Sequence, residues 1–184
     1  MKKSVIILCF LFAGLTSMMP ASAQSKLKIV IIRHGEKQEK YENLNCMGLN
    51  RSLKLVNVLH KKIGVPDYIY VPSVGNGATT THSRMFQTIT PFAVTYNLSI
   101  NSRFGSADLE KIAADLKDKK GVVLFVWNHE NIVALAKALG VKVKGLKWSN
   151  SDFDSMWTIT GKGKNRTLEA DREGIVPGQN CGSY

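Results

Sequence analysis

The chain has 184 residues, of which 44% are hydrophobic and 21% charged, and its formal net charge is +11. This length is typical of one domain with one sizeable core, and we expect no second domain. The excess of positive charge suits an acidic partner, such as a phosphate ester, an anionic lipid headgroup or nucleic acid, although solubility alone would also account for it.

Residues 1–23 have the pattern of a signal peptide. They combine a basic start, an apolar run over Val5–Leu15 and small residues that end at Ala23. The apolar run is shorter than the roughly 20 residues that a membrane-spanning helix needs. We therefore expect cleavage before Gln24, which leaves one domain, 24–184, in the periplasm or outside the cell without stable membrane insertion. A retained N-terminal anchor is the alternative.

Two cysteines, Cys46 and Cys181, remain in the expected mature chain. An oxidising compartment would permit them to pair, but the sequence does not show whether they meet. Neither lies in a CxxC or Cys/His arrangement, so we expect no zinc site.

Strand and helix patterns alternate from the start of this domain. Residues 27–32 are apolar and β-branched, which is typical of a buried strand in a parallel sheet. Apolar residues then recur at three- and four-residue steps over 49–63, which predicts a helix that Gly64 ends. Asp67–Val71 predicts a second short strand, and 72–77 a loop.

The second half of the chain continues the alternation. A helix is predicted over 81–96, with Pro91 expected to kink or restart it, and another over 108–116. Val122–Trp127 is the most strand-like run of the chain. The later predicted elements are a helix through Ile132, Leu135 and Leu139 that stops at Gly140, a strand over 156–160, a hairpin turn over 161–165, and a loop-like tail from Gly174.

This alternation predicts an α/β fold, a three-layer sandwich whose mostly parallel central sheet is covered by helices on both faces. Ligands of such sheets bind outside the carboxyl ends of the strands. His34 follows the first strand and His129 follows Val122–Trp127, so we expect both at one rim, together with Arg33 and Arg84. Two imidazoles and two guanidiniums favour a phosphoryl group, because arginine matches phosphate oxygens with paired hydrogen bonds.

These residues resemble the histidine phosphatase superfamily, which also contains the phosphoglycerate mutases. Arg33-His34-Gly35-Glu36-Lys37 after a hydrophobic strand resembles its signature. The chain departs from the family pattern before the second histidine, where Asn128 stands in place of the usual glycine. Further matching segments follow in the same order along the chain: Gly48–Arg51, Ser83–Thr88, the strand that leads to His129, and Asp152–Trp157.

The resemblance implies a phosphatase with a phosphohistidine mechanism. His34 would attack phosphorus as a neutral imidazole, and water would then release phosphate. Arg33, Arg84 and His129 would hold the phosphoryl oxygens and stabilise their charge. No metal and no cofactor is implied.

The sequence leaves the proton donor open between two carboxylic acids. Glu36 lies two residues after the proposed nucleophile, and Glu130 directly follows His129. His82 and Arg51 are further candidates for contact with substrate, or for a supporting role beside it. His60 lies in the last turn of its predicted helix, where a structural role is expected.

The expected substrate is a small phosphate ester or a phosphorylated component of the cell envelope. A mutase is less favoured, because export separates the protein from glycolytic phosphoglycerates. The competing hypotheses are a non-catalytic envelope protein that binds phosphate ligands in the same pocket and, from the basic charge, a nucleic-acid-binding protein. Nucleic acid is not expected, because no aromatic side chains interleave with the basic run at Lys162–Lys164.

Overall fold

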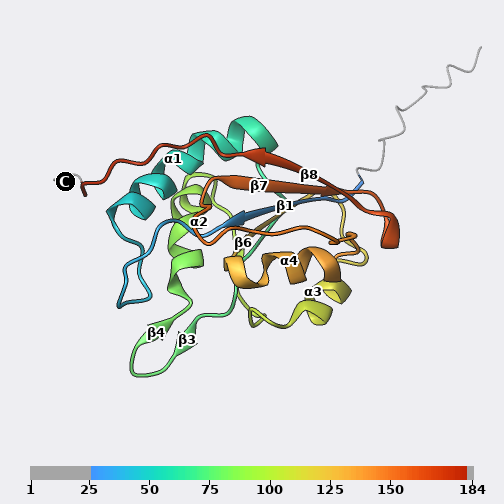
Figure 1. Ribbon diagram of the computed structural model, residues 1–184, viewed down its shortest axis with the longest axis horizontal. Coiled ribbons are helices and arrows are strands. Elements are labelled where there is room, and N and C mark those ends of the chain that lie inside the picture. The colour runs from blue at the N-terminus through green and yellow to red at the C-terminus, as the bar shows by residue number, and fades with distance from the viewer. Residues whose placement is uncertain (1–25, 182–184) are drawn as a thin grey trace, which may run out of the picture.

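The computed structural model describes residues 26–181, so the predicted signal peptide lies outside the described residues. The main sheet has six strands in the order β5-β2-β6-β1-β7-β8, and a separate two-stranded hairpin joins β3 to β4 (Figure 1). The elements are β1 (Lys28–Arg33), α1 (Cys46–Ile63), β2 (Tyr68–Tyr70), β3 (Gly75–Asn76), β4 (Thr80–Thr81), α2 (Ser83–Thr95), β5 (Ile100–Asn101), α3 (Leu109–Asp115), β6 (Val122–Trp127), α4 (His129–Ala138), β7 (Ser155–Thr160), the short 3-10 helix η1 (Gly163–Asn165) and β8 (Thr167–Arg172).

The sheet is mostly parallel, as predicted. β5, β2, β6 and β1 run in one direction, and β7 pairs with β1 antiparallel. In the β1–β6 ladder Arg33 lies opposite Trp127. The residues that follow these two strands, including His34 and His129, therefore emerge side by side at one edge of the sheet.

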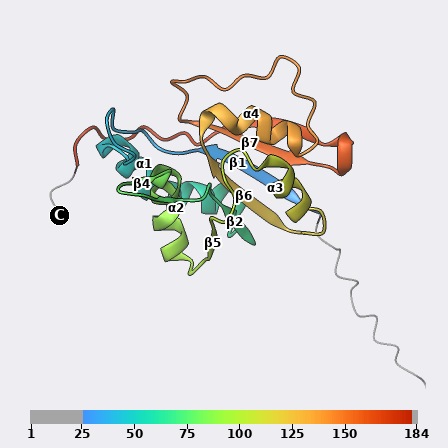
Figure 2. The same ribbon diagram turned by 90° about the horizontal axis from the view of Figure 1, so that it is seen from below.

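Helices cover both faces of the sheet, which confirms the three-layer prediction (Figure 2). Because side chains alternate along a strand, successive residues of β1 enter different cores. Ile29 and Ile31 pack with residues of α3 and α4. Val30 and Ile32 pack with residues of α1 and α2. Burial on both faces explains why these strands are continuous apolar runs rather than alternating ones.

Some elements differ from the sequence prediction. α2 runs through Pro91 without restarting. The hairpin β3–β4 occupies what was predicted as loop, and β5 and β8 were not predicted. β8 lies at the edge of the sheet, and most of its side chains are exposed, so its sequence carries little apolar pattern. The predicted turn over 161–165 is confirmed, since β7 and β8 pair antiparallel across it.

The C-terminal tail returns to the start of α1. Cys46 and Cys181 form a disulfide with their Cα atoms 4.7 Å apart. Asn50 donates hydrogen bonds to the carbonyls of Gly178 and Asn180. The tail is thus fastened to the helix that follows the His34 loop. Within residues 26–181, no helix is both long and apolar enough to cross a membrane.

Candidate active site

A cavity of about 230 Å³ lies at the carboxyl edge of β1 and β6. It contains both predicted histidines, and it also contains Arg84 and Glu130. The full lining is His34, Lys37, Glu42, His82, Arg84, Met85, Asn128, His129 and Glu130. Met85 is the one apolar member, so the cavity suits a polar or charged ligand.

The backbone holds His34 in a defined tautomer. Its Nδ1 lies 2.7 Å from the carbonyl oxygen of Gly35, so Nδ1 carries the hydrogen and Nε2 is left with a free lone pair. The side chain is 2% exposed. Burial, together with the positive charges of Arg33 and Arg84, lowers the pKa of His34 to about 3. At neutral pH the imidazole is therefore uncharged, as a nucleophile at phosphorus must be.

Two glycines allow the His34 loop to lie directly against α1. A Cβ atom on Gly48 would overlap the backbone carbonyl of Glu36, and one on Gly35 would crowd the backbone of Gly48. The amide of Gly35 also donates to the hydroxyl of Thr88 at 2.9 Å. Contacts from α1 and α2 together thus fix the loop.

Arg84 approaches the cavity from the first turn of α2. Its NH2 group pairs with a carboxylate oxygen of Glu42 at 3.2 Å. The same oxygen accepts the amide hydrogen of His82, which has a left-handed backbone conformation with φ 58°. Glu42 therefore occupies one side of the guanidinium and links the loop before α1 to the start of α2.

Arg33 lies behind the cavity and is not among its lining residues. Its NH1 group donates to the backbone carbonyls of Asn150 at 2.6 Å and Asp152 at 3.2 Å. Its guanidinium also stacks on the ring of Phe153 at 3.8 Å from the centroid. Burial lowers the pKa of Arg33 to about 10, and the group still carries its charge at neutral pH. Arg33 thus fastens the loop before β7 and adds positive charge beside His34.

Three buried polar atoms around His34 have no hydrogen-bond partner among residues 26–181. They are Nε of Arg33, Nε of Arg84 and Oδ1 of Asn128. Buried donors normally find partners, and leaving one without costs about 1–3 kcal/mol. Of the two arginines, Arg84 lines the cavity, so its free Nε donor matches an oxygen of a bound anion.

His129 and Glu130 begin α4, and both line the cavity. Burial and the charge of Arg33 lower the pKa of His129, although Glu130 opposes this. Glu130 is exposed, whereas His129 is half-buried. Because both residues lie in the first turn of α4, a ligand in the cavity lies close to the positive end of the α4 dipole.

Glu36 and Arg51 do not reach this cavity. Arg51 binds the Glu36 carboxylate through Nε and NH2, at 2.8 Å for the shortest contact, and binds Glu173 through NH1 at 2.6 Å. All three residues are buried. Burial raises the pKa of Glu173 to about 8, against the attraction of Arg51. Glu36 is thus committed to a buried ion network on the far side of its loop.

Several lining residues were missing from the sequence prediction. Lys37 and Asn128 directly adjoin motif residues, and this adjacency was the available signal. Glu42 lies in an irregular loop whose path the sequence does not indicate. Its main-chain carbonyl accepts from Ser83 at 2.5 Å, and Asn43 pairs with Gln87 at 2.8 Å. Contacts with α2 therefore place this loop.

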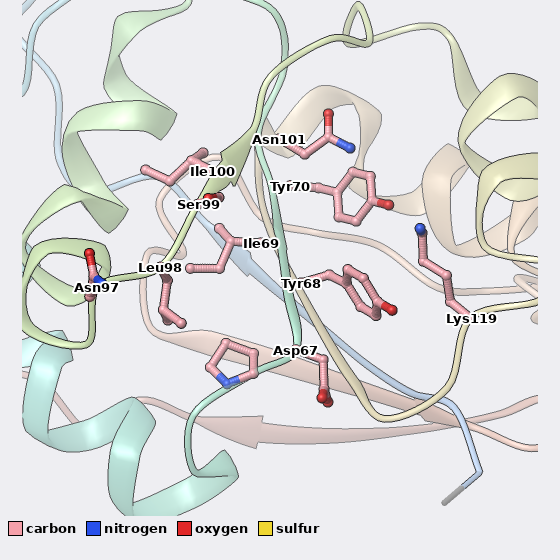
Figure 3. A pocket seen from close by; sticks show the side chains of 11 residues that line it. Asp67, Tyr68, Ile69, Tyr70, Asn97, Leu98, Ser99, Ile100, Asn101 and Lys119 are labelled. Carbon is pink, nitrogen blue, oxygen red and sulfur yellow. The ribbon is translucent and has the colours of Figure 1, made fainter.

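A second cavity, of about 350 Å³, lies beside the β2–β5 edge of the sheet (Figure 3). It is lined by neither histidine nor arginine. Its two charged residues have structural partners: Asp67 accepts the amide of Val122 at 2.7 Å, and the Lys119 amine lies 4.5 Å from the centre of the Tyr68 ring. This cavity offers no comparable chemistry.

No protein-family model and no curated protein matches the sequence. Solved structures do match. A mycobacterial glucosyl-3-phosphoglycerate phosphatase in complex with inorganic phosphate superposes with TM-score 0.55 at 13% identity, over 78% of this chain and 95% of that chain. The alpha-ribazole phosphatase of Shigella flexneri superposes with TM-score 0.55 at 12% identity, over 85% of this chain and 99% of that chain. The phosphoglycerate mutase of Bacillus anthracis superposes with TM-score 0.53 at 14% identity, over 80% of this chain and 93% of that chain. At these identities the likeness shows a shared fold.

Proposed function

Because the chain has the fold of the histidine phosphatase superfamily, we propose that it hydrolyses a phosphomonoester through a phosphohistidine intermediate on His34. The observation that carries this proposal is the geometry around that imidazole. Its Nε2 is unprotonated, and the positive charges of Arg33 and Arg84 act on it. A nucleophile surrounded by cationic donors is what transfer of an anionic phosphoryl group requires.

The reaction has two displacements at phosphorus. In the first, the lone pair of His34 Nε2 attacks, the bond from phosphorus to the ester oxygen breaks, and the departing oxygen takes a proton from Glu130. In the second, water attacks the phosphohistidine, Glu130 takes its proton, and the electrons of the phosphorus–nitrogen bond return to His34. The developing charge is held by side chains of the protein, and we propose that no metal takes part.

Two observations support Glu130 rather than Glu36 as the proton donor. Glu130 lines the cavity with both histidines. Glu36 accepts from two nitrogen atoms of Arg51 and is 9% exposed. The pH–rate profiles of Glu130→Gln and Glu36→Gln test the assignment. Loss of the basic limb in Glu130→Gln alone is expected, whereas a wild-type profile in that variant would refute the role.

We also propose that the protein acts in the periplasm or outside the cell, after cleavage before Gln24. The disulfide between Cys46 and Cys181 supports this, because such bonds persist in oxidising compartments. The substrate would then be a small phosphate ester or a phosphorylated envelope component. Cell fractionation followed by N-terminal sequencing checks both statements, and a protein that keeps Met1 in the cytoplasm would contradict them.

Release of phosphate from an aryl phosphate ester tests the catalytic proposal. His34→Ala should abolish turnover while the circular dichroism spectrum stays unchanged. His60→Ala, which removes an exposed histidine stacked on Tyr96 at the end of α2, is the matched control and should keep full activity. Acid-quenched enzyme should carry a phosphoryl group on His34. Full activity in His34→Ala would exclude the mechanism, and phosphate binding without turnover in the wild type would favour the non-catalytic binding protein.

A further inference from the structure

The positive charge of the protein is concentrated at the end of the molecule opposite the candidate active site. β1 and β6 begin there, since Lys28 lies opposite Val122, and β7 ends there, since Ile29 lies opposite Ile159. In Figure 1 this end is on the right, where β1 starts and the β7–β8 connection turns, and the His34 loop lies on the left. We call this end the basic pole. It is formed by residues 26–28, 117–120, 141–147 and 160–167.

The two ends differ sharply in charge. The four segments of the basic pole contain eleven lysine or arginine residues and one acidic residue, Asp118. The segments around the active-site edge, 33–42, 82–84, 128–130 and 149–154, contain six acidic residues and four lysine or arginine residues. The net positive charge of the folded chain therefore belongs to one pole rather than to the surface as a whole.

The lysines of the β7–β8 turn and of the loop after α4 are exposed and free of acidic partners within the described chain. Among residues 26–181, the lysines that form ion pairs are Lys62, Lys111 and Lys119. None of them belongs to these two segments. Like charges held close together without counter-charges cost free energy, and nothing in the fold offsets that cost. An external anionic surface would offset this cost.

A groove of about 420 Å³ runs between the two segments. Lys142, Lys164 and Arg166 provide positive charge along it, and its lining also includes the apolar side chains of Val141, Leu146 and Leu168 and the polar residues Asn165 and Thr167. Arg166 joins the walls, because it bridges to Val141 through the backbone and donates from its side chain to the carbonyl of Leu139 at 2.9 Å. Positive charge over apolar lining is the chemistry that a phospholipid headgroup region matches.

We propose that the basic pole docks on a membrane surface rich in anionic phospholipid, with headgroup phosphates at Lys142, Lys144, Lys162 and Lys164. This proposal stands on charge and shape, and it does not depend on the phosphatase assignment. Nucleic acid fits less well, because none of the four segments contains an aromatic residue on which a base could stack. Docking in this way leaves the active-site edge facing away from the lipid, open to solutes.

Vesicle co-sedimentation of the purified protein tests the proposal. The probes are vesicles of phosphatidylcholine alone and of phosphatidylcholine mixed with phosphatidylglycerol. The test variant is K142Q/K144Q/K162Q/K164Q, and the matched control replaces four exposed lysines elsewhere, K40Q/K54Q/K61Q/K111Q. All three proteins share one N-terminus, so any contribution from that segment cancels.

We expect binding to the phosphatidylglycerol vesicles alone, and weaker binding as salt is raised. Each lysine lost from the contact should lower the partition coefficient roughly fivefold, so the test variant should lose roughly several-hundred-fold and the control little. Unchanged thermal unfolding of both variants shows that they are folded. Absence of binding, equal loss in both variants, or tighter binding to duplex DNA than to the vesicles would overturn the proposal.

Discussion

The buried His34 predicts a specific loss of stability in acid. Its pKa is lowered from 6.5 to about 3 by burial and by the neighbouring arginines, so the unfolded chain takes up a proton at a pH where the folded protein does not. The stability of the folded state is therefore complete above about pH 6.5 and falls as the pH decreases towards about 3. At about pH 5 the two pKa values imply a cost of about 2 kcal/mol from this one residue.

Urea unfolding at about pH 7.5 and about pH 5 measures this cost as a difference of differences. His34→Asn should lose about 2 kcal/mol less than the wild type between the two pH values. Asn128→Ala changes a rim residue without removing a titrating group and should keep the wild-type difference. If His34→Asn and the wild type lost the same free energy, the imidazole would not be held neutral by its surroundings, and the nucleophile argument would fail with it.

Three further predictions concern contacts around the site. Arg51→Met should destabilise the fold by about 3–5 kcal/mol in urea unfolding, because the buried carboxylate of Glu36 loses its charged partner and the buried Glu173 loses its hydrogen-bond donor; a loss below about 1 kcal/mol would contradict the buried network. Reduction of the disulfide, or the double variant C46S/C181S, should lower the unfolding free energy by up to about 5 kcal/mol, since the bond closes a loop of 135 residues; equal midpoints with and without reductant would exclude it. Glu42→Gln should tighten competitive inhibition by inorganic phosphate about two- to fivefold, because the carboxylate that pairs with Arg84 is removed, and weaker inhibition would show that Glu42 supports the anion site instead.

The layers of the fold and the meeting of the two histidines could be predicted from the sequence. Both follow from long apolar runs, because the carboxyl ends of parallel strands meet at one edge. β5 and β8 could not be predicted, since a two-residue strand and an exposed edge strand carry almost no apolar period. Glu42 was missed for a related reason, because tertiary contacts with α2 place its loop.

The roles of neighbouring motif residues were harder to separate than their location. Side chains alternate between the two faces of a strand, and this alternation along β1 distinguishes Arg33 from His34. Residues 29, 31 and 33 share the face that α3 and α4 cover, and Arg33 accordingly reaches the loop before β7. After the strand ends no such period applies. Nothing in the sequence therefore indicated that Glu36 would turn towards α1, where Arg51 binds it.

The partners of the two arginines explain how the cavity can be stable without a ligand and still favour one. Two guanidiniums desolvated beside an imidazole repel each other, and the repulsion is reduced by the backbone carbonyls on Arg33 and the carboxylate on Arg84. The carbonyl contacts use only one nitrogen of Arg33. Glu42 is held by its ion pair with Arg84, and the Glu42 side chain is 36% exposed. An arriving phosphoryl group therefore has to displace only the weaker partner, Glu42, while it gains the buried Nε donor of Arg84, which has no partner among residues 26–181. In the proposed phosphatase reaction, return of Glu42 to Arg84 would then favour release of phosphate, which has to leave in every cycle.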